Sequence, residues 1–110
     1  MKNIKVLMLI VFCSIILQSC RNSAEDKKQE AIELMTAQTL GLAYMEEFKL
    51  DEAEIEFLKY IKLASKEKLG YANLGLVYLR MGQYKDAEKQ LSKAIEIDSL
   101  KTNSPEFFKT

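Results

Sequence analysis

Residues 68–101, KLGYANLGLVYLRMGQYKDAEKQLSKAIEIDSLK, decide the fold of this chain. The segment is rich in Ala, Leu, Glu and Lys, which favour helix, and it contains no proline. Gly82 interrupts it, and glycine readily adopts the left-handed backbone that ends a helix. We therefore predict two helices, over Lys68–Met81 and Lys85–Ile97, joined by a turn at Gly82.

The same pattern occurs 34 residues earlier, in residues 34–67. A shift of 34 residues aligns identical residues: Leu40 with Leu74, Gly41 with Gly75, Leu42 with Leu76, Tyr44 with Tyr78 and Ala53 with Ala87. Chance overlap of two helical sequences would match Leu, Lys and Glu, but would not also align glycine with glycine and tyrosine with tyrosine. The sequence thus predicts two units, 34–67 and 68–101, with the second helix of the first unit over Asp51–Ala64.

Gly41 and Gly75 lie inside predicted helices, where each glycine costs about 1 kcal/mol relative to alanine. This cost is explained if the missing side chain lets the second helix of the same unit approach closely. Ala87 would supply the small residue on the facing helix, and Tyr78, one turn beyond the glycine, would fill the space beside the crossing. The first unit repeats this arrangement.

These residues resemble the tetratricopeptide repeat. The second unit carries the repeat pattern at Tyr71, Leu74, Gly75, Tyr78, Gly82, Tyr84, Ala87, Leu91 and Ala94. The first unit carries it at Leu40, Gly41, Tyr44, Leu50, Ala53 and Phe57. The first unit departs from the pattern at Ala37, Phe48 and Tyr60, where the family usually has a large aromatic, the turn glycine and a small residue. The resemblance implies an all-α fold, a short α-solenoid of two helix–turn–helix units.

The resemblance also implies a concave groove that is lined by the first helix of each unit and binds a protein or peptide. The 34-residue register places these candidate residues in the groove: Gln38, Leu42, Met45, Leu69, Leu76, Leu79 and Arg80. Such a surface is apolar and bears methionine, which suits an apolar peptide or helix. The same leucines could instead pack against neighbouring helices, and the sequence leaves both interpretations open.

The first nineteen residues, Met1–Ser19, have the organisation of an export signal. Lys2 and Lys5 form a basic start, and Val6–Leu17 is an apolar core of twelve residues. This core is shorter than the stretch of about 20 apolar residues that crosses a membrane as a helix. A basic start followed by a short apolar core is typical of a cleaved signal peptide.

Residues 17–20, LQSC, resemble the lipobox of bacterial lipoproteins, with Gln18 at a position that is usually small. The resemblance implies cleavage between Ser19 and Cys20 and attachment of acyl chains to Cys20, which would anchor the protein to a membrane. The alternative is an ordinary signal peptide that leaves Cys20 as a free thiol. Arg21 follows the cysteine, so the Asp that retains enteric lipoproteins at the inner membrane is absent, and we expect the outer membrane.

Residues 20–33 are predicted to form the lipidated N-terminus, a polar tether and the start of a helix. Ser23 and Asp26 have the spacing of a capping box, which predicts a helix that begins at Ala24.

The composition argues against several classes of function. The chain has 16 basic and 16 acidic residues and no histidine. Mixed charges give no basic patch for nucleic acid. Without histidine, and with Cys20 assigned to the lipid, there is no His/Cys metal site and no Ser–His or Cys–His nucleophile. We therefore predict no enzymatic activity, no cofactor and no metal.

The C-terminal end of the repeat array leaves alternatives open. Two repeats are fewer than the three or so that usually bury a continuous core. Residues 102–110 are predicted to form a partial third helix or a cap, since Ser104-Pro105 has the pattern of a helix start. The chain could also be a fragment, or another chain could cover the surface of Leu91, Ala94 and Ile95.

The sequence therefore favours a lipid-anchored, protein-binding scaffold of the bacterial envelope. The alternative is a structural or truncated repeat subunit that self-associates and has no separate ligand.

Overall fold

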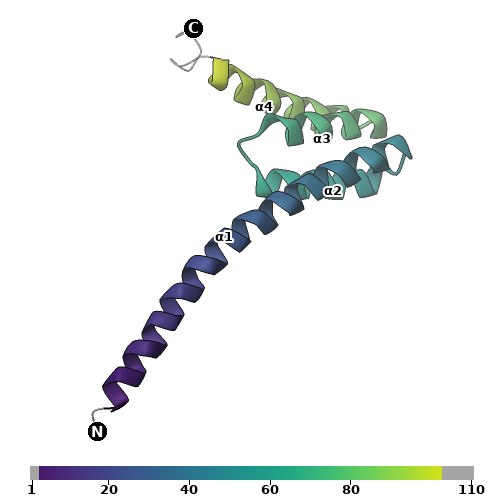
Figure 1. The fold of residues 1–110 in the computed structure, drawn as a ribbon. Helices are drawn as coiled ribbons and strands as arrows, with labels where there is room; N and C mark the ends of the chain where they lie inside the picture. Colours follow the sequence, from purple (N-terminus) through teal and green to yellow (C-terminus); the bar gives the residue numbers. More distant parts are fainter. Residues whose placement is uncertain (1–2, 103–110) are drawn as a thin grey trace. The chain divides into compact units, whose positions relative to one another are not determined.

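The computed structural model describes residues 3–102, except for the side chains of residues 18–22. Within these residues there are four helices and no strand: α1 (Asn3–Glu46), α2 (Leu50–Leu63), α3 (Lys68–Met81) and α4 (Tyr84–Thr102) (Figure 1). The predicted all-α class is confirmed. The chain divides after Ile32 into two units, which are described separately. The expected partial third helix or cap lies almost entirely outside the described residues.

The N-terminal unit, up to Ile32, is helical throughout its described part, because α1 begins at Asn3. The predicted helix start at Ala24 is therefore wrong while residues 3–23 are present, and the polar tether is helical as well. Residues 3–32 contain no glycine or proline that would end a helix. The large apolar side chains between Ile4 and Leu17 are each at least half exposed. Of the helices in residues 3–102, none is both long enough and apolar enough to cross a membrane.

The second unit contains two helix–turn–helix pairs, formed by the end of α1 with α2 and by α3 with α4. The bounds of α3 are those predicted from the sequence, and α2 begins and ends one residue earlier than predicted. Helix α4 continues five residues beyond the predicted end at Ile97. Two ion pairs join this extension to the start of α3 and the loop before it: Lys68 with Asp98 at 2.6 Å and Lys101 with Glu67 at 3.3 Å.

Both hairpin turns use the same hydrogen-bond pattern after the first helix. The amide of Gly82 donates to the carbonyl of Leu79 at 3.1 Å, and the amide of Gln83 donates to that of Tyr78 at 2.8 Å. These two bonds form a Schellman motif, and Gly82 has the positive φ of 79° that the motif requires. Phe48 takes the same place in the first turn, with φ of 62° and an equivalent pair of bonds of 3.2 and 2.8 Å.

The close helix crossings predicted at Gly41 and Gly75 are present. A Cβ added to Gly75 would lie 2.7 Å from Cγ and Cδ2 of Leu91, on α4. A Cβ added to Gly41 would lie 2.7 Å from the ring of Phe57, on α2. Ala87, the small residue of the second crossing, is fully buried.

A third close approach, between α2 and α3, was not predicted from the sequence. A Cβ on Gly70 would lie 2.7 Å from Cδ1 of Tyr60 and 2.9 Å from Cγ1 of Ile61. Tyr60 stands where the family usually has a small residue, and its side chain is nonetheless buried. The absence of a side chain at Gly70 makes room for the larger ring.

The main core lies between the end of α1, α2 and α3. Its buried members are Met45, Ala53, Phe57, Leu74 and Val77, and partly buried side chains surround them: Tyr44, Leu50, Ile61, Tyr78 and Met81. Because these residues come from both repeats, residues 34–67 and residues 68–101, the two repeats share one core.

The surface of α4 is less open than expected. Of the three residues predicted to be uncovered, Ala94 is buried and Leu91 is half-buried at the Gly75 crossing. Ile95 alone of the three is exposed, to 66%. The prediction is therefore wrong for Ala94 and Leu91, because both lie on the side of α4 that packs against α3.

Candidate protein-binding face

Three leucines on α3 form the surface that we call the leucine face: Leu69, Leu76 and Leu79. They are seven and three residues apart, so they share one side of the helix. Their side chains are 39%, 45% and 40% exposed, respectively. Helix α3 contains no acidic residue, so no carboxylate of its own would be desolvated by an apolar partner. This arrangement can bind an apolar side of a peptide or helix.

The other candidate groove positions come from α1. Leu42 is 41% exposed and Gln38 is half-buried, so both have surface available for contact. Met45 does not, because it is 6% exposed and belongs to the core with Phe57 and Leu74. The placement of Met45 in a groove is therefore wrong. Its flexible side chain fills the space between α1 and the later helices.

The guanidinium of Arg80 has a partner inside the protein. Its Nη1 donates a hydrogen bond to the carbonyl oxygen of Met45 at 3.0 Å. The last turn of α1 contains no basic residue, and the C-terminal carbonyls of a helix carry partial negative charge. Arg80 therefore stabilises the end of α1 from the neighbouring helix. The groove role of Arg80 stays a prediction, and its guanidinium also makes this contact within the protein.

A tyrosine–carboxylate hydrogen bond joins the two helix pairs. The hydroxyl of Tyr78, on α3, donates to Oε1 of Glu54, on α2, at 3.0 Å. The pKa of Tyr78 is raised to about 12, first by burial and then by the hydrogen bond to Glu54 and its negative charge. Burial, followed by the charge of Glu67, also raises the pKa of Tyr60. At neutral pH both tyrosines are therefore protonated, and Tyr78 is a hydrogen-bond donor.

Two family models, both described as tetratricopeptide repeat, match the chain. One matches residues 36–67 and the other matches residues 69–99, so each match lies inside one predicted unit. Together they cover more than half of the 110 residues. The chain is a tetratricopeptide repeat protein. No catalytic family is among the matches, and no curated protein or solved structure matches the chain.

The two tetratricopeptide repeats differ in what covers their first helices. Met45 of the first repeat and Leu79 of the second are equivalent, since they are 34 residues apart. Met45 is buried in the core that α3 helps to form, whereas Leu79 is 40% exposed. The 34-residue register aligns the two positions but does not show which of the two side chains is buried.

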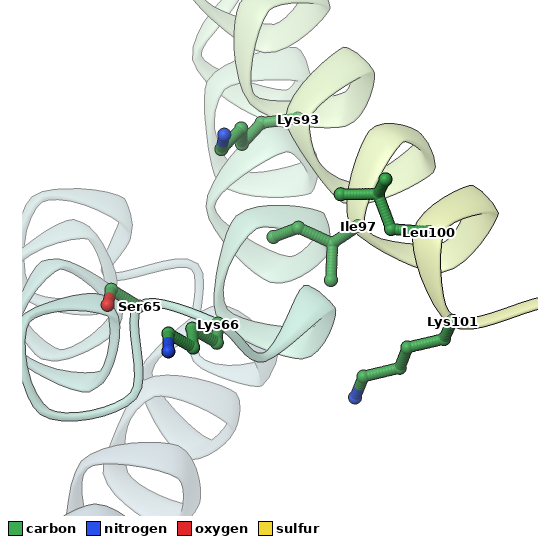
Figure 2. A pocket seen from close by; sticks show the side chains of 6 residues that line it. All are labelled: Ser65, Lys66, Lys93, Ile97, Leu100 and Lys101. Atoms are coloured by element: carbon green, nitrogen blue, oxygen red, sulfur yellow. The ribbon is translucent and has the colours of Figure 1, made fainter. Parts of the chain in front are cut away.

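A second surface feature of this tetratricopeptide repeat protein was not predicted. A pocket of about 580 Å³ lies between the α2–α3 loop and α4 (Figure 2). Its lining residues are Ser65, Lys66, Lys93, Ile97, Leu100 and Lys101. The spacing of residues 93, 97 and 100 indicates one side of a helix, but the sequence did not show that the loop of residues 65–66 would face it.

The remaining predicted sites concern lipid and metal. The side chains of Ser19 and Cys20 lie outside the described residues, so lipid attachment stays a prediction. In the part of the chain that the structure describes, no three His, Cys, Asp or Glu side chains come together in a group that could hold a metal ion.

Proposed function

We propose that this tetratricopeptide repeat protein is a lipid-anchored scaffold of the bacterial cell envelope that holds a protein partner on its leucine face. The exposure of Leu79, at a position whose equivalent in the first repeat is buried, carries the proposal. Repeats of this family generally bind other proteins, which agrees with such a role.

The leucine face favours a helix as the bound element. In repeat 1, residues of α2 and α3 pack around Met45 of the first helix and bury it. An apolar helix from a partner, laid against α3, would bury Leu79 in the same manner. Covering each of the three leucines contributes roughly 1 kcal/mol, because complete burial of a leucine contributes about 1.5–3 kcal/mol and part of each side chain is already buried. The face alone thus supports modest affinity, and further contacts from α1 would add to it.

The proposed lipid anchor rests on the N-terminal sequence. Residues 17–20 have the order of an aliphatic residue, a small residue and cysteine that a lipobox uses, with Gln18 as the departure. The exposed apolar side chains between Ile4 and Leu17 form a surface that is unfavourable in water and suits a membrane-inserted leader. Two or more acyl chains on Cys20 would hold the mature protein stably on a bilayer. We place it at the outer membrane, because Arg21 follows the cysteine.

Replacing Cys20 tests the anchor. We expect Cys20→Ala to abolish incorporation of labelled palmitate and to leave an unprocessed precursor, because the thioether requires a thiol. The readouts are radiolabel in the purified protein and the mass of its N-terminus, with Cys13→Ala as the matched control. Release of a normally cleaved Cys20→Ala protein would contradict the lipoprotein assignment. Fractionation of the unaltered protein with the inner membrane would contradict its placement.

Charges on the leucine face test the partner site. We expect the double variant Leu76→Asp, Leu79→Asp to lose partners that co-purify with the membrane-bound protein after crosslinking of membranes, because burial of each carboxylate against an apolar surface is unfavourable. The control is Ile55→Asp, at a 62% exposed isoleucine on α2. Equal loss in both variants, with both still folded by circular dichroism, would exclude the leucine face as the site.

A further inference from the structure

The pocket between the α2–α3 loop and α4 combines positive charge with an apolar floor. Among the described residues that line it, Lys66, Lys93 and Lys101 carry positive charge and none is acidic. Ile97 is almost fully buried beneath the pocket, whereas Leu100 is 68% exposed beside it. Such a surface offers hydrophobic contact and attraction for anions at the same place.

The three lysines differ in the partners they already have. Lys101 pairs with Glu67 at 3.3 Å, and Lys93 pairs with Glu96 at 3.6 Å. Both pairs are about half exposed, so each is weak and readily exchanged. For Lys66, no ion pair is found with the residues that the structure describes. Lys66 is therefore the charge most available to a ligand, followed by Lys93, whose ion pair is the longer of the two.

The charged ends of the three lysines do not converge on one point. In Figure 2 the ammonium groups of Lys66, Lys93 and Lys101 lie apart from one another, Ile97 points toward the space among them, and Leu100 lies beside Ile97 on α4. A single compact anion cannot contact all three. An extended ligand with separated carboxylates and a large apolar group between them can contact the three charges and the floor together.

The walls of the pocket are tied to each other. The ion pairs of Lys68 with Asp98 and of Lys101 with Glu67 connect the end of α4 to the loop and start of α3. Of these two pairs, Lys68 with Asp98 uses no lining lysine, so it can stay intact and limit the entropy that the protein loses when a ligand binds.

We propose that this pocket is a second binding site, for an acidic peptide segment in which carboxylates flank a phenylalanine- or leucine-sized side chain. The apolar side chain would contact Ile97 and Leu100, and the carboxylates would meet Lys66 and Lys93. None of the lining residues belongs to the leucine face, so this site does not depend on the proposed function.

Fluorescence anisotropy with a labelled peptide, Asp-Glu-Phe-Glu-Asp, tests the proposal on the full-length chain in nonionic detergent. We expect saturable binding that weakens as salt is added, because the attraction is between exposed charges. The double variant Lys66→Ala, Lys93→Ala should bind about tenfold more weakly, since two partly exposed ion pairs are lost. The matched control, Lys59→Ala with Lys62→Ala, removes two exposed lysines from α2 and should bind normally.

Two further probes separate this ligand from others. A peptide with alanine in place of phenylalanine, and the Leu100→Ser variant, should each reduce affinity, which shows that the floor is used. The proposal is overturned if the alanine peptide binds as well as the original, or if the control lysines matter as much as Lys66 and Lys93. It is also overturned if anionic phospholipid vesicles, and not the peptide, bind in a manner that requires Lys66 and Lys93.

Discussion

At the scale of single residues, the first hairpin turn shows how a repeat tolerates a departure from its pattern. Phe48 has a φ of 62°, in the left-handed region where the second repeat has Gly82. For a residue with a Cβ this conformation costs about 1–2 kcal/mol. The hydrogen bonds of the turn hold Phe48 there although its side chain is 67% exposed and gains little from packing.

Phe48→Gly should therefore stabilise the protein by about 0.5–1 kcal/mol, which is the strain relieved less the greater chain entropy of glycine in the unfolded state. Urea denaturation of the full-length chain measures this. The reciprocal variant, Gly82→Ala, should destabilise by about 1 kcal/mol because it introduces the same strain. If Phe48→Gly is destabilising instead, contacts of the phenylalanine ring outweigh the strain.

The hydroxyl of Tyr78 predicts a dependence of stability on alkaline pH. Its pKa is about 12 in the folded protein and near the ordinary value of 10 when unfolded. The folded state holds this proton more tightly, so the stabilisation is complete below pH 10 and is lost as the pH rises toward 12. Tyr78→Phe should lose stability at neutral pH and show a smaller fall over this range.

Urea titrations on both sides of this pH range measure the effect. Tyr84→Phe, at a 70% exposed tyrosine, serves as the control and should keep the full pH dependence. An unchanged dependence in Tyr78→Phe would assign the alkaline loss to another group.

At the scale of helices, the sequence predicted the helix crossings that lie within one repeat. The pairs Gly41 and Tyr44, and Gly75 and Tyr78, predicted the two crossings within repeats, and both are present. The crossing between repeats was missed. Gly70 and Tyr60 compensate each other, but they lie in different repeats, so the 34-residue register does not align them.

The Gly75 crossing gives a prediction about helix packing. Gly75→Leu should destabilise by about 1–3 kcal/mol or more, because the added side chain would occupy the space of Leu91 and overpack the interface. Lys93→Ala should change stability by less than about 0.5 kcal/mol, because Lys93 is exposed and its pair with Glu96 is weak. Equal effects in urea denaturation would mean that α3 and α4 do not cross closely at Gly75.

The candidate site was only partly predictable at this scale. The register identified Leu42, Leu69, Leu76 and Leu79, which are all exposed. It also selected Met45, which is buried, since repeat position alone does not reveal which side chains the next helix covers. The lysine pocket was missed because its two walls, the loop of residues 65–66 and α4, are far apart in the sequence.

At the scale of the whole molecule, the two repeats behave as one packed body. Met45 and Phe57 of the first repeat pack with Leu74 and Val77 of the second. This shared core joins the two repeats into one cooperative packing unit. On the same body, the leucine face of α3 is partly exposed, and it is the surface that we propose for a partner.

The central claim is that a different protein binds the leucine face. A photo-crosslinking amino acid at position 76, in the protein as living bacteria express and process it, tests this most directly, with position 55 on α2 as the control. We predict a discrete adduct from position 76 that contains a second, different protein, and little from position 55. No adduct from position 76, equal adducts from both positions, or an adduct that consists of two copies of this chain would contradict the claim.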